Sequence, residues 1–187
     1  MSTLIINEHK SKAYPPRTFY NVALADLTLA FVVNSLTAGE KLTAKAAGAS
    51  YVAVWYYASI TDAVDSILDM CLRNNVKVLN VAGNGIYTFA EFGITQTQVN
   101  KKLYDILTVV QGKHPISRIV SGGQTGTDIA GAVVAEVLGI DCEMTYPKGF
   151  RMRNANNEEI YSTENEIREM VAAQAYYLRE QLNWKEY

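Results

Sequence analysis

The sequence has few of the residues that mark metal, redox or histidine-dependent sites. Its two cysteines, Cys71 and Cys142, lie in apolar surroundings without metal-binding or redox spacing. We expect both to be reduced core residues. Its two histidines, His9 and His114, are isolated from any candidate nucleophile or metal partner. We therefore assign neither histidine a catalytic role and expect no metal site and no bound cofactor.

The chain also carries little net charge and few long apolar segments. The formal net charge is −2, which does not provide the basic surface that binding to nucleic-acid phosphates requires. The N-terminal stretch MSTLIINEHKSK lacks the apolar segment of a signal peptide, and no stretch approaches a membrane span. We expect a cytoplasmic protein without membrane or nucleic-acid partners.

What the chain does contain is a series of short apolar runs that alternate with helical patterns. Strands are predicted at residues 27–33, 51–56, 76–81, 118–120 and 142–146, with an edge strand at 4–6. Helices are predicted at 63–73, 99–110 and 125–138, followed by a long C-terminal helix that opens with a capping box at 163–166. This alternation indicates an α/β fold with a mostly parallel sheet covered on both faces.

The most distinctive stretch is RIVSGGQTGTDIAG at residues 118–131, where a strand breaks into a glycine-rich turn before a helical pattern begins. The first amides of a helix lack partners within it, and glycines let the backbone approach a phosphate closely. A turn that only permits tight helix–strand packing, and an ordinary capping role for the aspartate, are the alternatives. The candidate ligand-binding residues of this turn are Gly122, Gly123, Gln124, Thr125, Gly126, Thr127 and Asp128.

Further candidates lie beside other predicted strands. Thr37 and Gly39 lie where a second helix should begin, although Thr37 is equally suited to cap that helix. Gly83 lies in the VAGNG loop, for which a turn with unusual backbone dihedral angles is the alternative. Asp26 is a candidate polar contact to a ligand, with an ordinary turn role as its alternative.

A basic cluster follows the last predicted strand. Lys148, Arg151 and Arg153 form the densest group of cations in a slightly acidic chain. At the same edge of the sheet they would meet phosphate or carboxylate groups, so Lys148 and Arg151 join the candidate ligand-binding residues. A solvated charged loop is the alternative.

The glycine-rich stretch resembles the SGGQTGxD motif of the molybdenum-cofactor carrier family. That family belongs to the SLOG superfamily of Rossmann-like nucleotide and ligand binders, which includes the YpsA, DprA and Lonely-Guy groups. The loop YPKGFR at 146–151 is similar to the CPKGR loop that follows the motif in the carrier family. The family's later segments NVxxSDxTLxF, LTGGTxLT and VLNVAG have likenesses at residues 21–31, 36–43 and 78–83.

These three likenesses precede the glycine motif here, whereas in the family they follow it. The chain therefore resembles a circular permutation of the family, and permutation is tolerated where chain ends lie at the surface. The resemblance implies a Rossmann-like three-layer sandwich formed by residues 1–187 as a single SLOG-type domain. Its core would span about 18–160, with an N-terminal extension and a C-terminal helix.

The resemblance also implies a function. We expect non-catalytic binding of a nucleotide-derived or other phosphorylated small molecule, with sequestration of a signalling nucleotide in virus–host defence as a specific version. In Lonely-Guy enzymes a glutamate helps to hydrolyse a glycosidic bond, but Ala130 occupies the corresponding position here and Ser121 replaces the motif's proline. Tyr146 replaces the cysteine of the carrier family's loop.

Two alternatives remain at this point, and one expectation concerns assembly. A nucleotide or glycosidic-bond hydrolase would need a carboxylate from Asp26, Glu40, Glu91 or Asp128; the other alternative is a molybdenum-cofactor carrier.

We also expect a homo-oligomer formed through the C-terminal helix, although the apolar face of that helix could cover the sheet instead. The aromatic residues of this helix and the segment after it are Tyr176, Tyr177 and Trp184.

Overall fold

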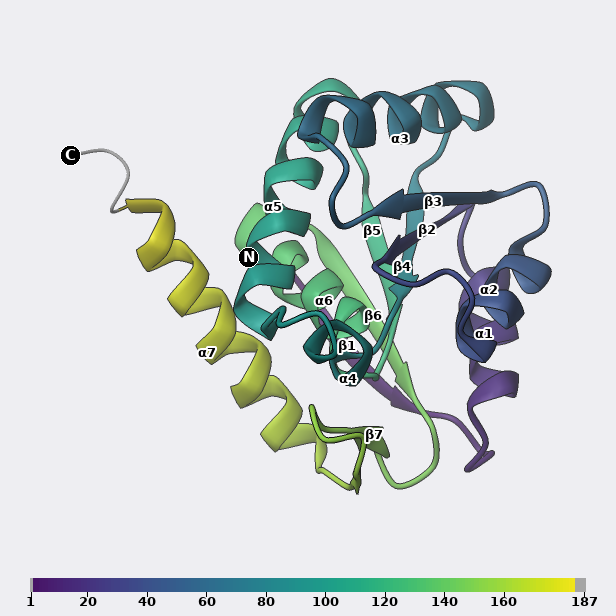
Figure 1. The fold of residues 1–187 in the computed structure, drawn as a ribbon, viewed down its shortest axis with the longest axis vertical. Coiled ribbons are helices and arrows are strands. Elements are labelled where there is room, and N and C mark those ends of the chain that lie inside the picture. Colours follow the sequence, from purple (N-terminus) through teal and green to yellow (C-terminus); the bar gives the residue numbers. More distant parts are fainter. Residues whose placement is uncertain (1, 184–187) are drawn as a thin grey trace.

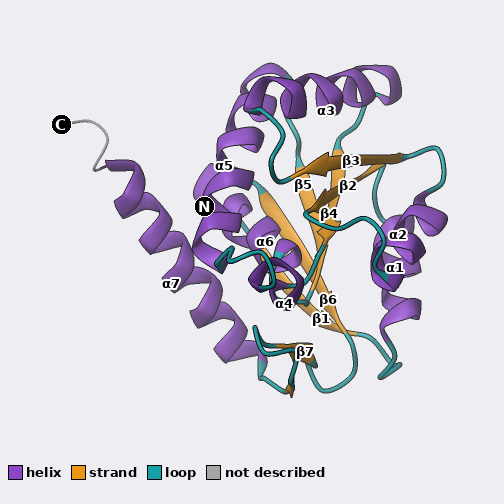
Figure 2. Cartoon of the chain, viewed as in Figure 1, coloured by secondary structure: helices purple, strands orange, loops and turns teal. Residues whose placement is uncertain are grey.

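The computed structural model describes residues 2–183. Six strands form one parallel sheet in the order β1-β6-β5-β4-β2-β3 (Figure 2). The strands are β1 (Leu4–Glu8), β2 (Leu27–Val32), β3 (Tyr51–Trp55), β4 (Val78–Gly83), β5 (Arg118–Gly122) and β6 (Asp141–Tyr146). All six predicted strands are confirmed, and the N-terminal one lies at an edge as expected.

Helices cover both faces of the sheet (Figure 1). On one face lie α1 (Tyr14–Ala23) and α2 (Ala38–Ala47). On the other lie α3 (Ile60–Asn74), α5 (Gln96–Lys113) and α6 (Thr127–Leu138), with α7 (Glu164–Asn183) packed outside α5 and α6. The remaining elements are the short helix α4 (Ile86–Ala90) and a hairpin of β7 (Met152–Arg153) and β8 (Glu159–Ile160). This arrangement confirms the predicted α/β fold with helical layers on both sides of a parallel sheet.

The two faces of the sheet differ in what they bury. Toward α3, α5 and α6, the strands present large apolar side chains such as Leu29 and Phe31, which are fully buried. Toward α1 and α2, the alternate positions of β2 and β4 are occupied by small or polar residues. The side chains of this second face therefore do not fill the space between the sheet and the helices α1 and α2. The residues concerned are Thr28, Ala30, Asn80 and Ala82, together with Gly122 of β5.

The chain reverses direction across the sheet between β2 and β4. These two strands are neighbours, but the chain leaves β2 for β3 at one edge and leaves β4 for β5 toward the other. The helices that follow them, α2 and α5, consequently lie on opposite faces. In open parallel sheets, such a point leaves a crevice at the carboxyl ends of the strands, where ligands bind.

Helix α7 begins at the predicted capping box and packs on other helices. The Thr163 hydroxyl accepts a hydrogen bond from the Glu166 amide at 3.3 Å, and the Glu166 carboxylate accepts one from the Thr163 amide at 2.7 Å. The helix packs on α5 and α6, and its Arg168 guanidinium also donates to the Leu4 carbonyl of edge strand β1 at 2.8 Å. Tyr176 and Tyr177 are exposed, and Trp184 lies outside the described residues, so homo-oligomerisation through α7 stays a prediction.

Within residues 2–183, no helix combines the length and apolar character that a membrane span needs.

Three short elements were not predicted from the sequence, namely α1, α4 and the β7–β8 hairpin. Of these, α1 matters most, because it covers the polar face of the sheet.

Gly126 is a position at which the fold requires glycine. Its φ is +94°, and a Cβ there would lie 2.5 Å from both the Asn84 carbonyl oxygen and the Ile86 nitrogen. We predict that Gly126→Ala lowers the free energy of unfolding by about 2–4 kcal/mol, because it adds both backbone strain and a steric clash. The measurement is urea denaturation of the purified variant.

Gly112→Ala is the matched control. Gly112 is exposed near the end of α5, and a Cβ there would meet no atom within 4 Å. This substitution should leave stability unchanged or raise it by up to about 1 kcal/mol. Equal effects of the two substitutions would contradict the structural role given to Gly126.

Candidate functional site

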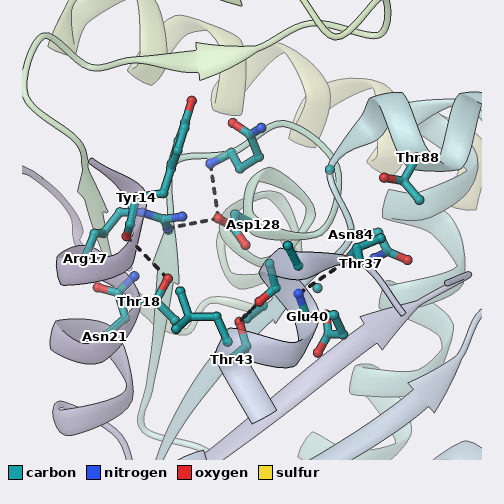
Figure 3. Close-up of a pocket in the computed structure, with 18 of the residues that line it drawn as sticks. Tyr14, Arg17, Thr18, Asn21, Thr37, Glu40, Thr43, Asn84, Thr88 and Asp128 are labelled. Atoms are coloured by element: carbon teal, nitrogen blue, oxygen red, sulfur yellow. Dashed lines mark hydrogen bonds and ion pairs between the residues drawn. The ribbon is translucent and has the colours of Figure 1, made fainter. Parts of the chain in front are cut away.

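A cavity of about 520 Å³ lies between α1, α2 and the polar face of the sheet, next to the loops that leave β2 and β4 (Figure 3). Its floor includes Asn80 and Ala82 of β4 and Gly122 of β5. Its walls come mainly from α1, the first turns of α2 and the loop that follows β4. The volume is within the range of small-molecule sites in proteins.

Helix α1 turns a polar stripe toward this cavity. Tyr14, Arg17, Thr18 and Asn21 follow one another at helical spacing and all line it. Arg17 and Asn21 are only 8% and 3% exposed, although a helix on a sheet usually buries apolar side chains. Helix α1 therefore forms one wall of a polar site.

Helix α2 directs its N-terminus toward the same cavity. The Thr37 hydroxyl accepts a hydrogen bond from the Glu40 amide at 3.2 Å, so Thr37 caps the helix, as its alternative interpretation held. Thr37, Ala38 and Gly39 all line the cavity. The first-turn amides of a helix have no intrahelical acceptors and carry partial positive charge, so this end of α2 favours an anion.

A buried ion pair joins α1 to α6 across the floor of the cavity. Nη1 of Arg17 lies 3.1 Å from Oδ2 of Asp128, and both side chains are largely buried (Figure 3). A Cβ on Gly122 would lie 1.4 Å from that Nη1, so only glycine leaves room for the pair. Burial raises the pKa of Asp128, whereas Arg17 and the Gln124 amide, which donates to the carboxylate at 3.1 Å, lower it.

The rest of the glycine motif mostly bonds to the protein itself. The Gly126 amide donates to the Gln96 side chain at 2.7 Å, and the Thr127 amide donates to the Asn84 carbonyl at 3.1 Å. The Thr127 hydroxyl donates to the Phe31 carbonyl at 2.9 Å. The two amides that begin α6 therefore already have acceptors within the protein.

Two more motif residues connect the turn to neighbouring segments. The Thr125 hydroxyl donates to the carbonyl of Arg153, and the Gln124 side chain accepts from the amide of the same residue at 3.1 Å. Gly123 lies against the Tyr146 ring, where a Cβ would be 2.0 Å from a ring carbon. Gly122, Gln124 and Asp128 thus line the cavity, while the other motif residues make contacts within the protein and do not line it, namely Gly123, Thr125, Gly126 and Thr127.

The loop after β4 holds the other strand end in place. Gly83 lines the cavity, and a Cβ there would lie 2.1 Å from the Phe31 carbonyl oxygen. The Asn84 side chain accepts from the amides of Val33 and Asn34, both at 2.8 Å, and donates to the Asn34 carbonyl at 2.9 Å. These bonds fix the two loops that form the mouth of the cavity.

The structure does not bring every predicted residue to this site. Asp26 precedes β2 at the opposite edge of the sheet, where its carboxylate accepts from the amides of Lys77 and Val78 at 2.8 Å. Its turn-role alternative is therefore the one observed. Lys148 is exposed and does not line the cavity.

The arginines of the basic cluster lie nearer the cavity. Arg153 lines it, whereas Arg151 stacks on the outer side of Tyr14, 4.6 Å from the ring centroid. Both arginines pair with Glu159, at 3.0 Å from Arg151 and 3.6 Å from Arg153. Their positive charge is thus partly neutralised within the protein.

Glu40 is the most unusual side chain in the cavity. It is 3% exposed, and its Oε1 accepts from the Tyr51 hydroxyl at 2.7 Å. Oε2 has no hydrogen-bond partner among residues 2–183. Burial raises the pKa of the Glu40 carboxyl; the bond from Tyr51 lowers it, and the charge of Asp128 adds to the rise.

Several cavity residues were not singled out in the sequence. Arg17, Asn21 and Thr18 belong to α1, whose signal is a polar stripe at helical spacing beginning with a proline in the first turn. Asn80 has a clearer signal, since it is a lone amide in the apolar run VLNVAG. A polar residue on an otherwise buried strand needs a specific partner.

The positions that decide between the alternative functions lie outside the cavity lining. Ala130 is fully buried within α6, and Tyr146 is fully buried beneath Gly123. In the part of the chain that the structure describes, no group of three or more His, Cys, Asp or Glu side chains is arranged to hold a metal ion. Cys71 and Cys142 are buried and unpaired, as predicted.

Comparison with known families matches residues 3–101 to the circularly permutated YpsA SLOG family. The chain belongs to this family. The match runs from β1 into α5, so it includes both helices that enclose the cavity. No curated protein and no solved structure matches the chain. Membership of the family indicates a function in binding or modifying nucleotide-related molecules.

The Arg17–Asp128 pair generates a stability prediction. Arg17→Met would leave the Asp128 carboxylate buried without its cation, so the free energy of unfolding at pH 7 should fall by about 3–5 kcal/mol. Adding Asp128→Asn should recover part of this loss, because the unpaired charge is then removed. Chemical denaturation of both variants measures the effect.

Arg118→Met provides the control, since it breaks the Arg118–Glu143 pair, whose arginine side chain is 38% exposed. We expect it to cost no more than about 1 kcal/mol. Similar losses in the free energy of unfolding for the two arginine variants would show that the Arg17–Asp128 pair matters no more to stability than a partly exposed pair.

Glu40 generates a prediction about pH. Because burial raises its pKa, the folded state binds the proton more tightly than the unfolded state. The stability that Glu40 contributes is therefore present below its usual pKa of 4.5 and is lost as the pH rises through the raised value. Relative to wild type, Glu40→Gln should become progressively more stable as the pH rises from 4.5 toward neutrality.

Thermal denaturation across that pH range measures this difference, with Glu91→Gln, an exposed glutamate near α4, as the control. The Glu91 variant should follow the wild-type pH profile. A Glu40→Gln profile parallel to wild type would show that the Glu40 pKa is not raised.

Proposed function

We propose that the protein binds a nucleotide-derived or other phosphorylated small molecule in the cavity between α1 and α2, without strong catalysis. The observation that carries this proposal is the polar interior of the cavity. Arg17, Asn21, Glu40 and Asn80 are all buried there, and each has a side-chain atom without a partner among the described residues. Proteins rarely leave such groups unsatisfied unless a ligand or water meets them.

In this proposal, the phosphate lies at the N-terminus of α2. Gly39 and Ala38 offer first-turn amides there, and the Arg17 guanidinium lines the same cavity with its Nε unpartnered within residues 2–183. The glycine motif contributes from the other side through Gly122, Gln124 and Asp128. Because Gly126 and Thr127 use their amides within the protein, we favour α2 over α6 as the phosphate-binding helix.

The cellular role that we propose is sequestration of a signalling nucleotide in virus–host defence. A cavity enclosed by two helices and a sheet suits the retention of a small molecule. The absence of the Lonely-Guy glutamate, replaced by buried Ala130, supports binding without turnover.

The alternative is hydrolysis of a nucleotide or its glycosidic bond. One observation supports it: Glu40 lies in the cavity, and its pKa is raised toward the range in which a carboxyl transfers protons. Incubating ribonucleoside 5′-monophosphates with the protein and analysing them for free base or phosphate separates the two functions. Turnover that Glu40→Gln abolishes would replace the binding proposal with the enzymatic one.

Binding itself is tested at Gly39. A Cβ there would meet no atom within 4 Å, so Gly39→Leu adds a side chain at the cavity wall while retaining good helix propensity. We predict that at least one of the four common ribonucleoside 5′-monophosphates at millimolar concentration raises the melting temperature of the wild type. Gly39→Leu should weaken that binding at least about tenfold, which is about 1.4 kcal/mol.

Gly112→Leu is the matched control, because Gly112 also lies in a helix with open space around it and is remote from the cavity. It should bind as wild type does. If no ribonucleotide binds, or if both leucine variants bind like wild type, the proposed site is wrong.

A further inference from the structure

Three carboxylate or carboxamide oxygen atoms on residues that line the cavity have no hydrogen-bond donor among residues 2–183. They are Oδ1 of Asn21, Oε2 of Glu40 and Oδ1 of Asn80, on residues of α1, α2 and β4. These residues are 2–3% exposed, and no donor for the three oxygens is present among residues 2–183. Three elements far apart in sequence thus each supply an acceptor to one cavity.

Neighbouring bonds hold two of these acceptors in position. The Tyr51 hydroxyl donates to Oε1 of Glu40 at 2.7 Å, so Oε2 is the oxygen left for a ligand. The Asn80 amide nitrogen donates to the Thr28 hydroxyl at 3.1 Å, which leaves Oδ1 as the free atom of that side chain. Such bonds restrict side-chain rotation, as expected of a pre-organised site.

The chemistry of these atoms limits what they can bind. Carboxylate and carboxamide oxygens accept hydrogen bonds from hydroxyl or amino groups. A cationic amine would gain only the Glu40 carboxylate as a counter-charge, because Asp128 is already paired with Arg17 and the end of α2 that faces the cavity is positive. Neutral donors fit best, and hydroxyl groups are the smallest of them.

The position of Glu40 decides which part of a nucleotide these donors belong to. Glu40 directly follows Gly39 in the first turn of α2, and both residues line the cavity. A ligand group that donates to Glu40 would therefore lie close to a phosphate held by the first-turn amides. In a nucleoside 5′-phosphate a single carbon separates the phosphate from the sugar ring, whereas the base lies beyond that ring. The sugar is therefore the group adjacent to a bound phosphate.

We infer that the inner end of the cavity binds the vicinal hydroxyl groups of a ribose, with Glu40, Asn80 and Asn21 as the acceptors. This inference rests on the proposed function and narrows it to ribonucleotide derivatives. The hydroxyls donate to Oε2 of Glu40 and to the amide oxygens, and the bond to the carboxylate is charge-assisted. The small side chain of Ala82 on the floor leaves room for the sugar ring.

The test compares sugars on a constant base and phosphate. Isothermal titration calorimetry with adenosine 5′-monophosphate and its 2′-deoxy and 2′,3′-dideoxy analogues measures the preference, with the guanosine and cytidine series as further probes. We expect the ribonucleotide to bind at least about tenfold more tightly than the dideoxy analogue. Glu40→Met, which removes the acceptor, should reduce this ratio to within about threefold.

Two controls separate the loss of the Glu40 acceptor from a general effect of the substitution. Glu91→Met replaces an exposed glutamate outside the cavity and should retain the wild-type ratio. A correctly folded Glu40→Met should still bind the dideoxy analogue, because that analogue keeps the phosphate and the base and lacks only the hydroxyl groups that Glu40 would accept from.

Each remaining outcome overturns a specific statement. If none of the ribonucleotides or deoxyribonucleotides binds, the proposed function fails, and this inference fails with it. If ribose and dideoxyribose forms bind wild type equally well, the inference is wrong while the proposed function stands. A preference set by the amino groups of the base, independent of the sugar, would assign the acceptors to the base and also overturn the inference.

Discussion

The buried ion pair between Arg17 and Asp128 is the interaction on which the site depends. It attaches α1, whose inner face is polar, to the start of α6 across the glycine at position 122. A helix with buried Arg17 and Asn21 has little apolar surface to pack on the sheet, and loss of either member of the pair would leave a buried charge without its partner. The polar wall of the cavity follows from that attachment.

The glycine motif has a larger structural role than its composition implies. Thr127 connects the start of α6 to β2 and to the loop after β4, Gly126 connects it to α5, and Thr125 connects it to the β7–β8 hairpin. One side of the motif still faces the cavity through Gly122, Gln124 and Asp128. The motif therefore positions the strand ends around the ligand site, while the amides open to an anion belong to α2.

The strands of the sheet and several residues of the candidate site could be predicted from the sequence. The same physical rules explain why other parts, such as α1, could not. Buried parallel strands are short apolar runs, so all six were recognisable, and Thr37 was recognisable as a helix cap. Helix α1 was missed because helix detection relies on an apolar stripe, and its buried residues are Arg17 and Asn21. Asp26, a candidate polar contact in the sequence, lies at the amino end of β2 and not in the cavity lining, where its carboxylate accepts from the Lys77 and Val78 amides.

Nucleotide binding in the cavity between α1 and α2 can be tested directly in solution. The most direct measurement is a titration of the ¹⁵N-labelled protein with adenosine 5′-monophosphate, followed by two-dimensional NMR with assigned amide resonances. We expect saturable shifts concentrated at Ala38, Gly39 and Glu40 of α2 and at Arg17 and its neighbours in α1. Saturable shifts confined to another surface, such as the outer face of α7, or no shifts with any of the four ribonucleoside monophosphates, would contradict it.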